Sequence, residues 1–218
     1  MKWACVLIII AGLLLLSAVS TLFSFPCYAM RFSATIQPIQ VCDDSGDTCS
    51  AIEFEGRTLQ SIFQQADLTL NILPFKRFNS SIYQTIDSIE EGNGLLGYRP
   101  GLIGLSPDPG IDDEANSNVL NVWFADSSFS PPGVVALAYV DYNRAWVISG
   151  LGVDVQTLIL AHAITHNFGL NHVEDWFNVM NEIFSFTMTS LYDWQVAIIQ
   201  ASRFVTPLES CKVERKLE

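Results

Sequence analysis

All three histidines of the 218-residue chain lie within one stretch of eleven residues, from His162 to His172. His162 and His166 are four residues apart, so on a helix their rings project from the same face, one turn apart. Gly169 follows them, and glycine readily adopts the positive φ that ends a helix and turns the chain sharply. The spacing predicts a helix that ends at Gly169 and a chain that brings His172 back to the other two rings.

Three converging imidazoles are typical of a catalytic zinc site. Zinc takes four ligands in a tetrahedron, and three protein nitrogens leave one position open for water. The alternative is that the histidines are ordinary surface or core residues of an amphipathic helix. A single pair would fit that alternative, but three histidines with a glycine among them favour a metal site. We therefore predict that His162, His166 and His172 bind Zn²⁺.

The stretch resembles the signature of the metzincin zinc metalloproteases, H-E-x-x-H-x-x-G-x-x-H followed by a methionine turn. Val179-Met180-Asn181 supplies the methionine, eight residues after His172, and this short spacing is that of the matrixin-like branch. The segments around Cys42–Cys49 and Ala201–Val205 are also similar to small secreted bacterial members. The resemblance covers most of residues 31–207 and implies a secreted zinc endopeptidase.

This resemblance implies an α+β fold. A mixed, twisted β-sheet would support an active-site helix, and a small helical C-terminal subdomain would follow the methionine turn. Residues 30–218 would form a single metzincin-like catalytic domain, with an N-terminal lobe of residues 30–169 and a C-terminal lobe of residues 170–218.

The resemblance also implies where a peptide or protein substrate, or an inhibitor, would bind. The strand at residues 119–124 looks like the edge strand that pairs with an extended peptide, with Asn121 and Trp123 as substrate-binding residues. Met180 is expected to form the hydrophobic floor beneath the zinc. Three later apolar residues are candidates for a specificity pocket, with ordinary core packing as an equal alternative: Phe184, Phe186 and Met188.

The sequence departs from the signature at Ala163, where the family has a glutamate. That glutamate is the general base, which takes a proton from zinc-bound water and passes it to the leaving amine. Alanine has no proton to exchange, and general acid–base catalysis is worth about 10²–10⁴-fold in rate. Zinc binding should persist because alanine is a good helix former and touches no metal. We therefore expect a zinc metallopeptidase with severely reduced activity.

Two questions stay open at this position. Glu174, Asp175 and Glu182 follow the histidines, but a substitute base must come within hydrogen-bond reach of the water, and we expect each to face solvent or to cap a turn. Without a base, the alternative function is that of a zinc-containing pseudoprotease that binds peptides or inhibitors. Ala163 is either natural or a deliberate inactivating substitution.

The first 29 residues have the pattern of a secretory signal. Lys2 is the only charge before Arg31, and an apolar run from Trp3 to Val19 leads to a cleavage site at Cys27-Tyr28-Ala29. The alternative is an uncleaved anchor, because about 17 apolar residues approach the length that spans a bilayer. We expect cleavage after residue 29 and a secreted or periplasmic protein without a membrane partner.

Cys42 and Cys49 bracket an acidic, turn-forming hexapeptide. In an oxidising compartment this spacing favours a disulfide that closes the small loop. A metal site is the weaker alternative, because no second cysteine pair accompanies this one.

Charge limits the classes of partner. Asp and Glu number 23 against 11 Lys and Arg, a net charge of −12, and such a surface repels phosphate, so we expect no nucleic-acid partner. Residues 108–114 contain four acids, which raises the question of Ca²⁺. Without a defined ligand spacing, a solvated loop is the favoured interpretation.

Hydrophobic periodicity predicts the elements that surround the histidines. The expected strands lie near residues 32–36, 68–72, 119–124, 134–140 and 145–149, and the expected helices cover residues 51–66, 154–168 and 190–204. Residues 75–118 are rich in turn-forming residues and are expected to form a long loop region with short elements. Asp154 is the expected N-cap of the histidine helix. One face of the last helix is expected to be buried, with Leu191, Trp194, Ile198 and Ala201.

Overall fold

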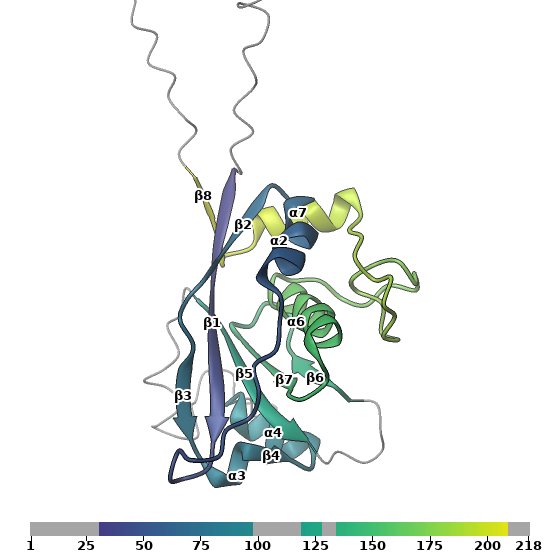
Figure 1. Cartoon of the computed structure of the whole chain (residues 1–218). Coiled ribbons are helices and arrows are strands. Elements are labelled where there is room, and N and C mark those ends of the chain that lie inside the picture. Colours follow the sequence, from purple (N-terminus) through teal and green to yellow (C-terminus); the bar gives the residue numbers. More distant parts are fainter. Residues whose placement is uncertain (1–30, 98–118, 128–133, 209–218) are drawn as a thin grey trace, which may run out of the picture. The chain divides into compact units, whose positions relative to one another are not determined.

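A mixed eight-stranded β-sheet and five helices make up the described residues, 31–97, 119–127 and 134–208, of the computed structural model (Figure 1). The main path of the sheet runs β2-β1-β5-β7-β6, and β3, β4 and β8 pair at its sides. The strand bounds are β1 Phe32–Cys42, β2 Leu68–Ile72, β3 Lys76–Asn79, β4 Thr85–Ile86, β5 Leu120–Ser127, β6 Ala136–Ala138, β7 Arg144–Ile148 and β8 Val205–Pro207. The mixed sheet that we expected is confirmed, since β6 and β8 pair antiparallel while the other pairs are parallel.

The sheet is covered by hydrophobic cores on both faces. Along β5, Val122 and Phe124 belong to one core, while Trp123 and Ala125 belong to another. Because neighbouring residues of a strand point to opposite faces, the two cores lie on opposite sides of the sheet. The first core includes the histidine helix, and the second includes α4, Ile89–Leu95.

The expectation that residues 119–124 form an edge strand is wrong. β5 lies inside the sheet, with β1 paired on one side and β7 on the other. Asn121 and Trp123 are both 0% exposed, so neither reaches a bound peptide. The nearly continuous apolar run at these positions is what a strand with both faces covered requires, and this signal was available in the sequence. In the described residues, the main path of the sheet ends at β2 on one side and at β6 on the other.

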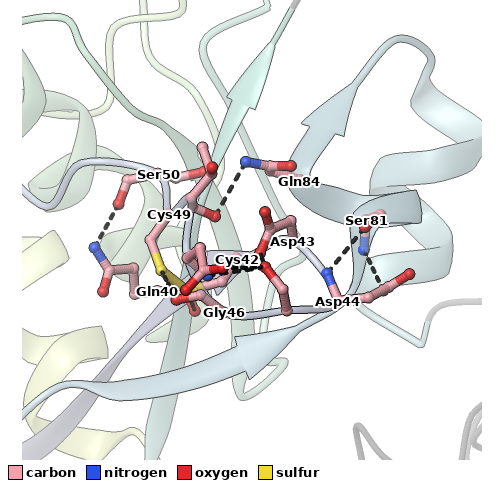
Figure 2. The surroundings of a disulfide bond; sticks show 12 residues. Gln40, Cys42, Asp43, Asp44, Gly46, Cys49, Ser50, Ser81 and Gln84 are labelled. Carbon is pink, nitrogen blue, oxygen red and sulfur yellow. Dashed lines mark hydrogen bonds between the residues drawn. A yellow bond between two sulfur atoms is a disulfide. The ribbon is translucent and has the colours of Figure 1, made fainter.

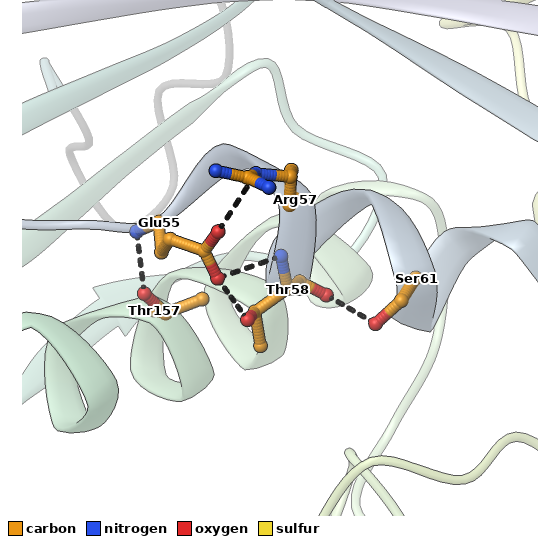
Figure 3. Close-up of polar contacts among 5 residues, drawn as sticks. All are labelled: Glu55, Arg57, Thr58, Ser61 and Thr157. Atoms are coloured by element: carbon orange, nitrogen blue, oxygen red, sulfur yellow. Dashed lines mark hydrogen bonds and ion pairs between the residues drawn. The ribbon is translucent and has the colours of Figure 1, made fainter.

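The first helix, α2, covers Gly56–Gln64 and begins five residues later than periodicity predicted. The preceding segment lies outside any helix or strand and bonds to the histidine helix: the backbone N–H of Glu55 donates to Oγ1 of Thr157 at 2.8 Å (Figure 3). The Glu55 carboxylate then caps α2, accepting from the backbone N–H of Thr58 at 3.1 Å. The bond between Glu55 and Thr157 connects parts of the chain about a hundred residues apart, so no local pattern predicts it.

The histidine helix, α6, covers Val153–Asn167. Its N-cap is Gly152, with φ of 81°, and Asp154 lies inside the first turn instead of capping it. A carboxylate there still interacts favourably with the positive end of the helix dipole. At the other end, Gly169 has φ of 112° and its N–H donates to the His166 carbonyl at 2.9 Å. The predicted end of the helix at this glycine is confirmed.

Short elements fill the described part of the expected loop region. After β3 come α3, Ser81–Gln84, then β4 and α4. The acidic residues 108–114 lie outside the described residues, as does the expected signal segment 1–29. In the part of the chain that the structure covers, no helix has the length and apolar character needed to span a bilayer.

The last helix, α7, covers Asp193–Ala201 and buries a different face from the one predicted. Gln195 and Ile199 are buried, whereas Trp194 and Ile198 are 49% and 38% exposed. The prediction assigned the apolar residues to the core. The structure instead uses a glutamine there, because its side chain has a specific partner described below.

The expected disulfide is present between Cys42 and Cys49, at the end of β1 (Figure 2). The loop that it closes is also held by backbone bonds, since the N–H of Asp43 donates to the Thr48 carbonyl at 2.8 Å. Asp44 and Ser81 exchange two further bonds, at 2.8 and 2.9 Å, that fix the loop to α3.

Candidate metal centre

The structure brings the three histidine rings to one point. The Nε2 atom of His166 lies 3.1 Å from that of His162 and 3.0 Å from that of His172, and the remaining pair is 3.2 Å apart. Three nitrogens at about 2.0–2.1 Å from one tetrahedral zinc would be about 3.3 Å from one another. The spacing therefore fits three ligands of a single ion.

Two of the rings are oriented by backbone carbonyls. Nδ1 of His162 lies 2.8 Å from the carbonyl oxygen of Val179, and Nδ1 of His166 lies 2.8 Å from that of Leu170. A carbonyl only accepts hydrogen bonds, so each Nδ1 carries the proton and donates it. Each Nε2 then presents a lone pair, which is the form that binds metal.

Burial keeps these two rings neutral. It lowers the pKa of both His162 and His166 to about 4, while the nearby carboxylate of Glu182 acts in the opposite direction on His162. Two neutral rings thus aim lone pairs at each other across 3.1 Å, an arrangement that a cation between them stabilises. The donor set of three imidazoles supports Zn²⁺ as that cation.

Met180 is fully buried at a tight turn that begins at Asn178. The Asn178 carbonyl accepts from the N–H of Asn181 at 3.0 Å, and its side-chain oxygen accepts from the N–H of Met180 at 2.9 Å. The amides of Asn178 and Gln195 also exchange two hydrogen bonds, at 2.7 and 3.1 Å, and both side chains are 0% exposed. This pair fixes the turn that carries the Val179 carbonyl.

Sequence reasoning missed the pair of Asn178 and Gln195. A signal was present, because Gln195 lies at a position that a buried helix face fills with an apolar residue. The partner could not be identified from the sequence, since 17 residues separate the two.

Ala163 is 1% exposed and belongs to the hydrophobic core, next in sequence to His162. Of the three carboxylates considered as substitutes, Glu174 is exposed. Asp175 caps the following turn, accepting from the N–H of Phe177 at 3.0 Å and from the Tyr192 hydroxyl at 2.6 Å. These bonds hold the pKa of Asp175 below its ordinary value, as the Tyr192 bond most of all favours the charged form. Glu182 is also exposed.

Glu182 lines a cavity of about 230 Å³ beside the histidines. Six apolar residues form most of the wall: Val134, Val135, Ala136, Ile159, Phe184 and Met188. His162, His172 and Asn181 complete it. Of the three residues suggested for a specificity pocket, Phe184 and Met188 line this cavity, while Phe186 is 69% exposed and does not.

The edge strand β6 borders the same cavity through Ala136. β6 pairs with β7 in antiparallel register, and no described strand pairs with its other side. An edge of this kind presents backbone N–H and C=O groups with which an extended chain can pair. The structure thus places a sheet edge, an apolar cavity and three histidines together.

No family model and no curated protein sequence matches the chain. Among solved structures, the chain is similar to metalloproteinase-II from Bacteroides fragilis, with a TM-score of 0.48 and 13% identity over 77% of this chain and 52% of that one. It is also similar to archaemetzincin from Methanopyrus kandleri, with a TM-score of 0.46 and 14% identity over 78% and 94% of the two chains. A structure described as a chaperone–substrate complex is similar with a TM-score of 0.48 and 12% identity, over 78% of this chain and 34% of that one. The chain spans about half the length of the Bacteroides structure and about a third of the chain in the complex.

Proposed function

We propose that the chain is a zinc-dependent metallopeptidase of the metzincin type, slowed by the alanine at position 163. The observation that carries the proposal is the group of three Nε2 atoms, 3.0–3.2 Å apart, beside an apolar cavity. Three protein ligands leave one position for water, as in catalytic zinc sites. The matrixin-like branch is part of the proposal, on the short spacing from His172 to Met180.

The chain's own residues would position both the metal and the substrate. His162, His166 and His172 hold zinc, which when bound lowers the pKa of its water and polarises the substrate carbonyl. A peptide or protein substrate, or an inhibitor, lies extended along β6 by β-augmentation. One apolar side chain of the peptide fills the adjoining cavity. Met180 forms the floor beneath the histidines.

Ala163 sets the expected rate. A methyl group buried in the core neither accepts nor returns a proton, so the acid–base contribution of about 10²–10⁴-fold is lost from this position. Zinc binding is expected to be unaffected, because Ala163 contributes no ligand atom to the histidine group.

We further propose that the protein works in an oxidising compartment, secreted or periplasmic, after removal of residues 1–29. The disulfide between Cys42 and Cys49 supports this, since such bonds persist mainly outside the cytosol.

The test compares this chain with Ala163→Glu. We expect both proteins to hold one zinc ion by metal analysis, and we expect Ala163→Glu to cleave a peptide library about 10²–10⁴-fold faster. Absence of zinc from both proteins would overturn the metal site. Full activity of the chain with Ala163, unchanged by the substitution, would overturn the slowed rate.

The alternative function is that of a pseudoprotease that holds peptides or inhibitors without cleaving them. The observation that favours it is the burial of Ala163, which is 1% exposed and packed as a core residue. It predicts that Ala163→Glu gains no hydrolysis while peptides still bind along β6. The same comparison therefore separates the two functions.

A further inference from the structure

One carboxylate in the described residues shares a cavity with the metal ligands. Glu182 lines the cavity together with His162 and His172, and it is exposed. The other two carboxylates near the histidines have different positions. Glu174 faces solvent and does not line the cavity, and Asp175 is engaged by Tyr192.

The backbone holds Glu182 in place on both sides. The Asn181 side chain accepts from the N–H of Ile183 at 2.7 Å, and the N–H of Asn181 donates to the Asn178 carbonyl at 3.0 Å. Asn178 is in turn fixed by the buried amide of Gln195. The backbone on both sides of Glu182 is therefore held in place by these hydrogen bonds. None of the hydrogen bonds described above involves the Glu182 carboxylate.

Glu182 is placed to act beside a metal and not as its ligand. In the described residues, the group of potential ligand atoms that lie within 4.8 Å of one another consists of the three histidines alone. A general base lies beside the metal and leaves a ligand position to water, and Glu182 lines the site without joining the ligand group.

We propose that Glu182 is a weaker general base of this site and supplies part of the proton transfer that a glutamate at position 163 would supply; this inference rests on the proposed function. The Glu182 carboxylate accepts a proton from the attacking water, whose oxygen forms a bond to the amide carbon of the substrate. The C–N bond then breaks, and the proton passes from Glu182 to the leaving nitrogen. One water and one amide become one acid and one amine, and the carboxylate is regenerated.

The test uses Glu182→Gln, which keeps the size of the side chain and removes its basicity, in the full chain loaded with zinc. Glu174→Gln is the matched control, because it removes the same charge from a nearby residue outside the cavity. Each substitution is made in the Ala163 chain and in the Ala163→Glu chain. Zinc affinity is measured by competition with a chelator, and peptide hydrolysis is measured at saturating substrate.

We expect Glu182→Gln to lower kcat at least about 10²-fold in the Ala163 chain, with zinc affinity unchanged. In the Ala163→Glu chain the same substitution should have little effect, since another base is present there. Glu174→Gln should change neither quantity. If Glu182 had only a structural role, Glu182→Gln would lower kcat equally in both chains. A loss of kcat in the Ala163 chain alone therefore identifies Glu182 as the base.

Three results would overturn the inference. In the first, Glu182→Gln is as active as its parent. In the second, it loses zinc affinity together with activity, which would make Glu182 a ligand. In the third, the Ala163 chain is inactive while Ala163→Glu is active, which refutes Glu182 but supports the proposed function. Zinc binding by neither chain would instead refute the proposed function itself.

Discussion

Nδ1 of His162 lies 2.8 Å from the carbonyl oxygen of Val179, the residue that precedes Met180. The contact joins the histidine helix to the turn that follows the last metal ligand. Because the carbonyl fixes which ring nitrogen carries the proton, it also fixes which nitrogen faces the metal. A displacement of this turn would therefore be expected to weaken zinc binding by His162.

The first prediction concerns the amide that supports this turn. Asn178→Ala removes both bonds to Gln195 and leaves the buried Nε2 of Gln195 without its acceptor, so we expect a loss of about 1–3 kcal/mol in the free energy of unfolding. Zinc affinity should fall about 10–100-fold, as for other groups that orient a ligand. Urea unfolding and chelator competition measure the two effects. Asn171→Ala, at an exposed asparagine, is the control, and an Asn178→Ala protein with normal zinc affinity would contradict the prediction.

The second prediction concerns the end of the histidine helix. Gly169 has φ of 112°, which an L-residue adopts only with strain of about 1–3 kcal/mol. We expect Gly169→Ala to destabilise the protein by that amount and to weaken zinc binding, because the adjacent Leu170 carbonyl orients His166. Gly56→Ala is the matched control, since a Cβ there meets only Ile72 at 3.6 Å. Equal stability of the two variants would refute the argument.

The third prediction is a pH dependence of the metal-free protein. The unfolded chain protonates His162 and His166 near the ordinary pKa of 6.5, whereas the folded chain does so only near pH 4. The unfolded state thus binds more protons between these values, so stability falls as the pH drops from about 6.5 to about 4 and this contribution levels off below. Urea unfolding across this range measures it. Replacing both residues with Gln should flatten the slope, and an unchanged slope would count against the burial of the rings.

The fourth prediction concerns the disulfide. For a loop of this size, the chain-entropy estimate gives about 2.5 kcal/mol of stabilisation, so Cys42→Ser with Cys49→Ser should lose about that amount. Zinc affinity should stay the same, because neither cysteine belongs to the ligand group. Thermal unfolding with and without a reducing agent provides the control: the reductant should shift the parent protein and leave the double variant unaffected.

Features set by short stretches of sequence could be predicted. The convergence of the histidines follows from helical spacing and from a glycine that ends the helix, all within eleven residues. The disulfide between Cys42 and Cys49 likewise closes a local loop. In both cases, the residues that form the recognisable sequence pattern are the same residues that come together in the structure.

Features set by distant partners could not be predicted. Residues 51–55 were expected within the helix but lie outside it, where Glu53 and Glu55 donate backbone bonds to side chains of α6. α7 buries Gln195 because its side chain is hydrogen-bonded to the buried side chain of Asn178, 17 residues earlier in the chain. The apolar run of β5 indicates a strand covered on both faces, but it does not identify β1 and β7 as the strands paired on either side. In each case a long-range contact overrides the local preference.

The bond between Asn178 and Gln195 also bears on the order in which the protein is assembled. During synthesis the three histidines leave the ribosome before Gln195, since Gln195 lies later in the chain. Until that glutamine is available, the Val179 carbonyl that orients His162 lacks its support. Tight capture of zinc is therefore expected to be a late event that follows the folding of α7, so a partly made chain would hold the metal weakly and release it readily.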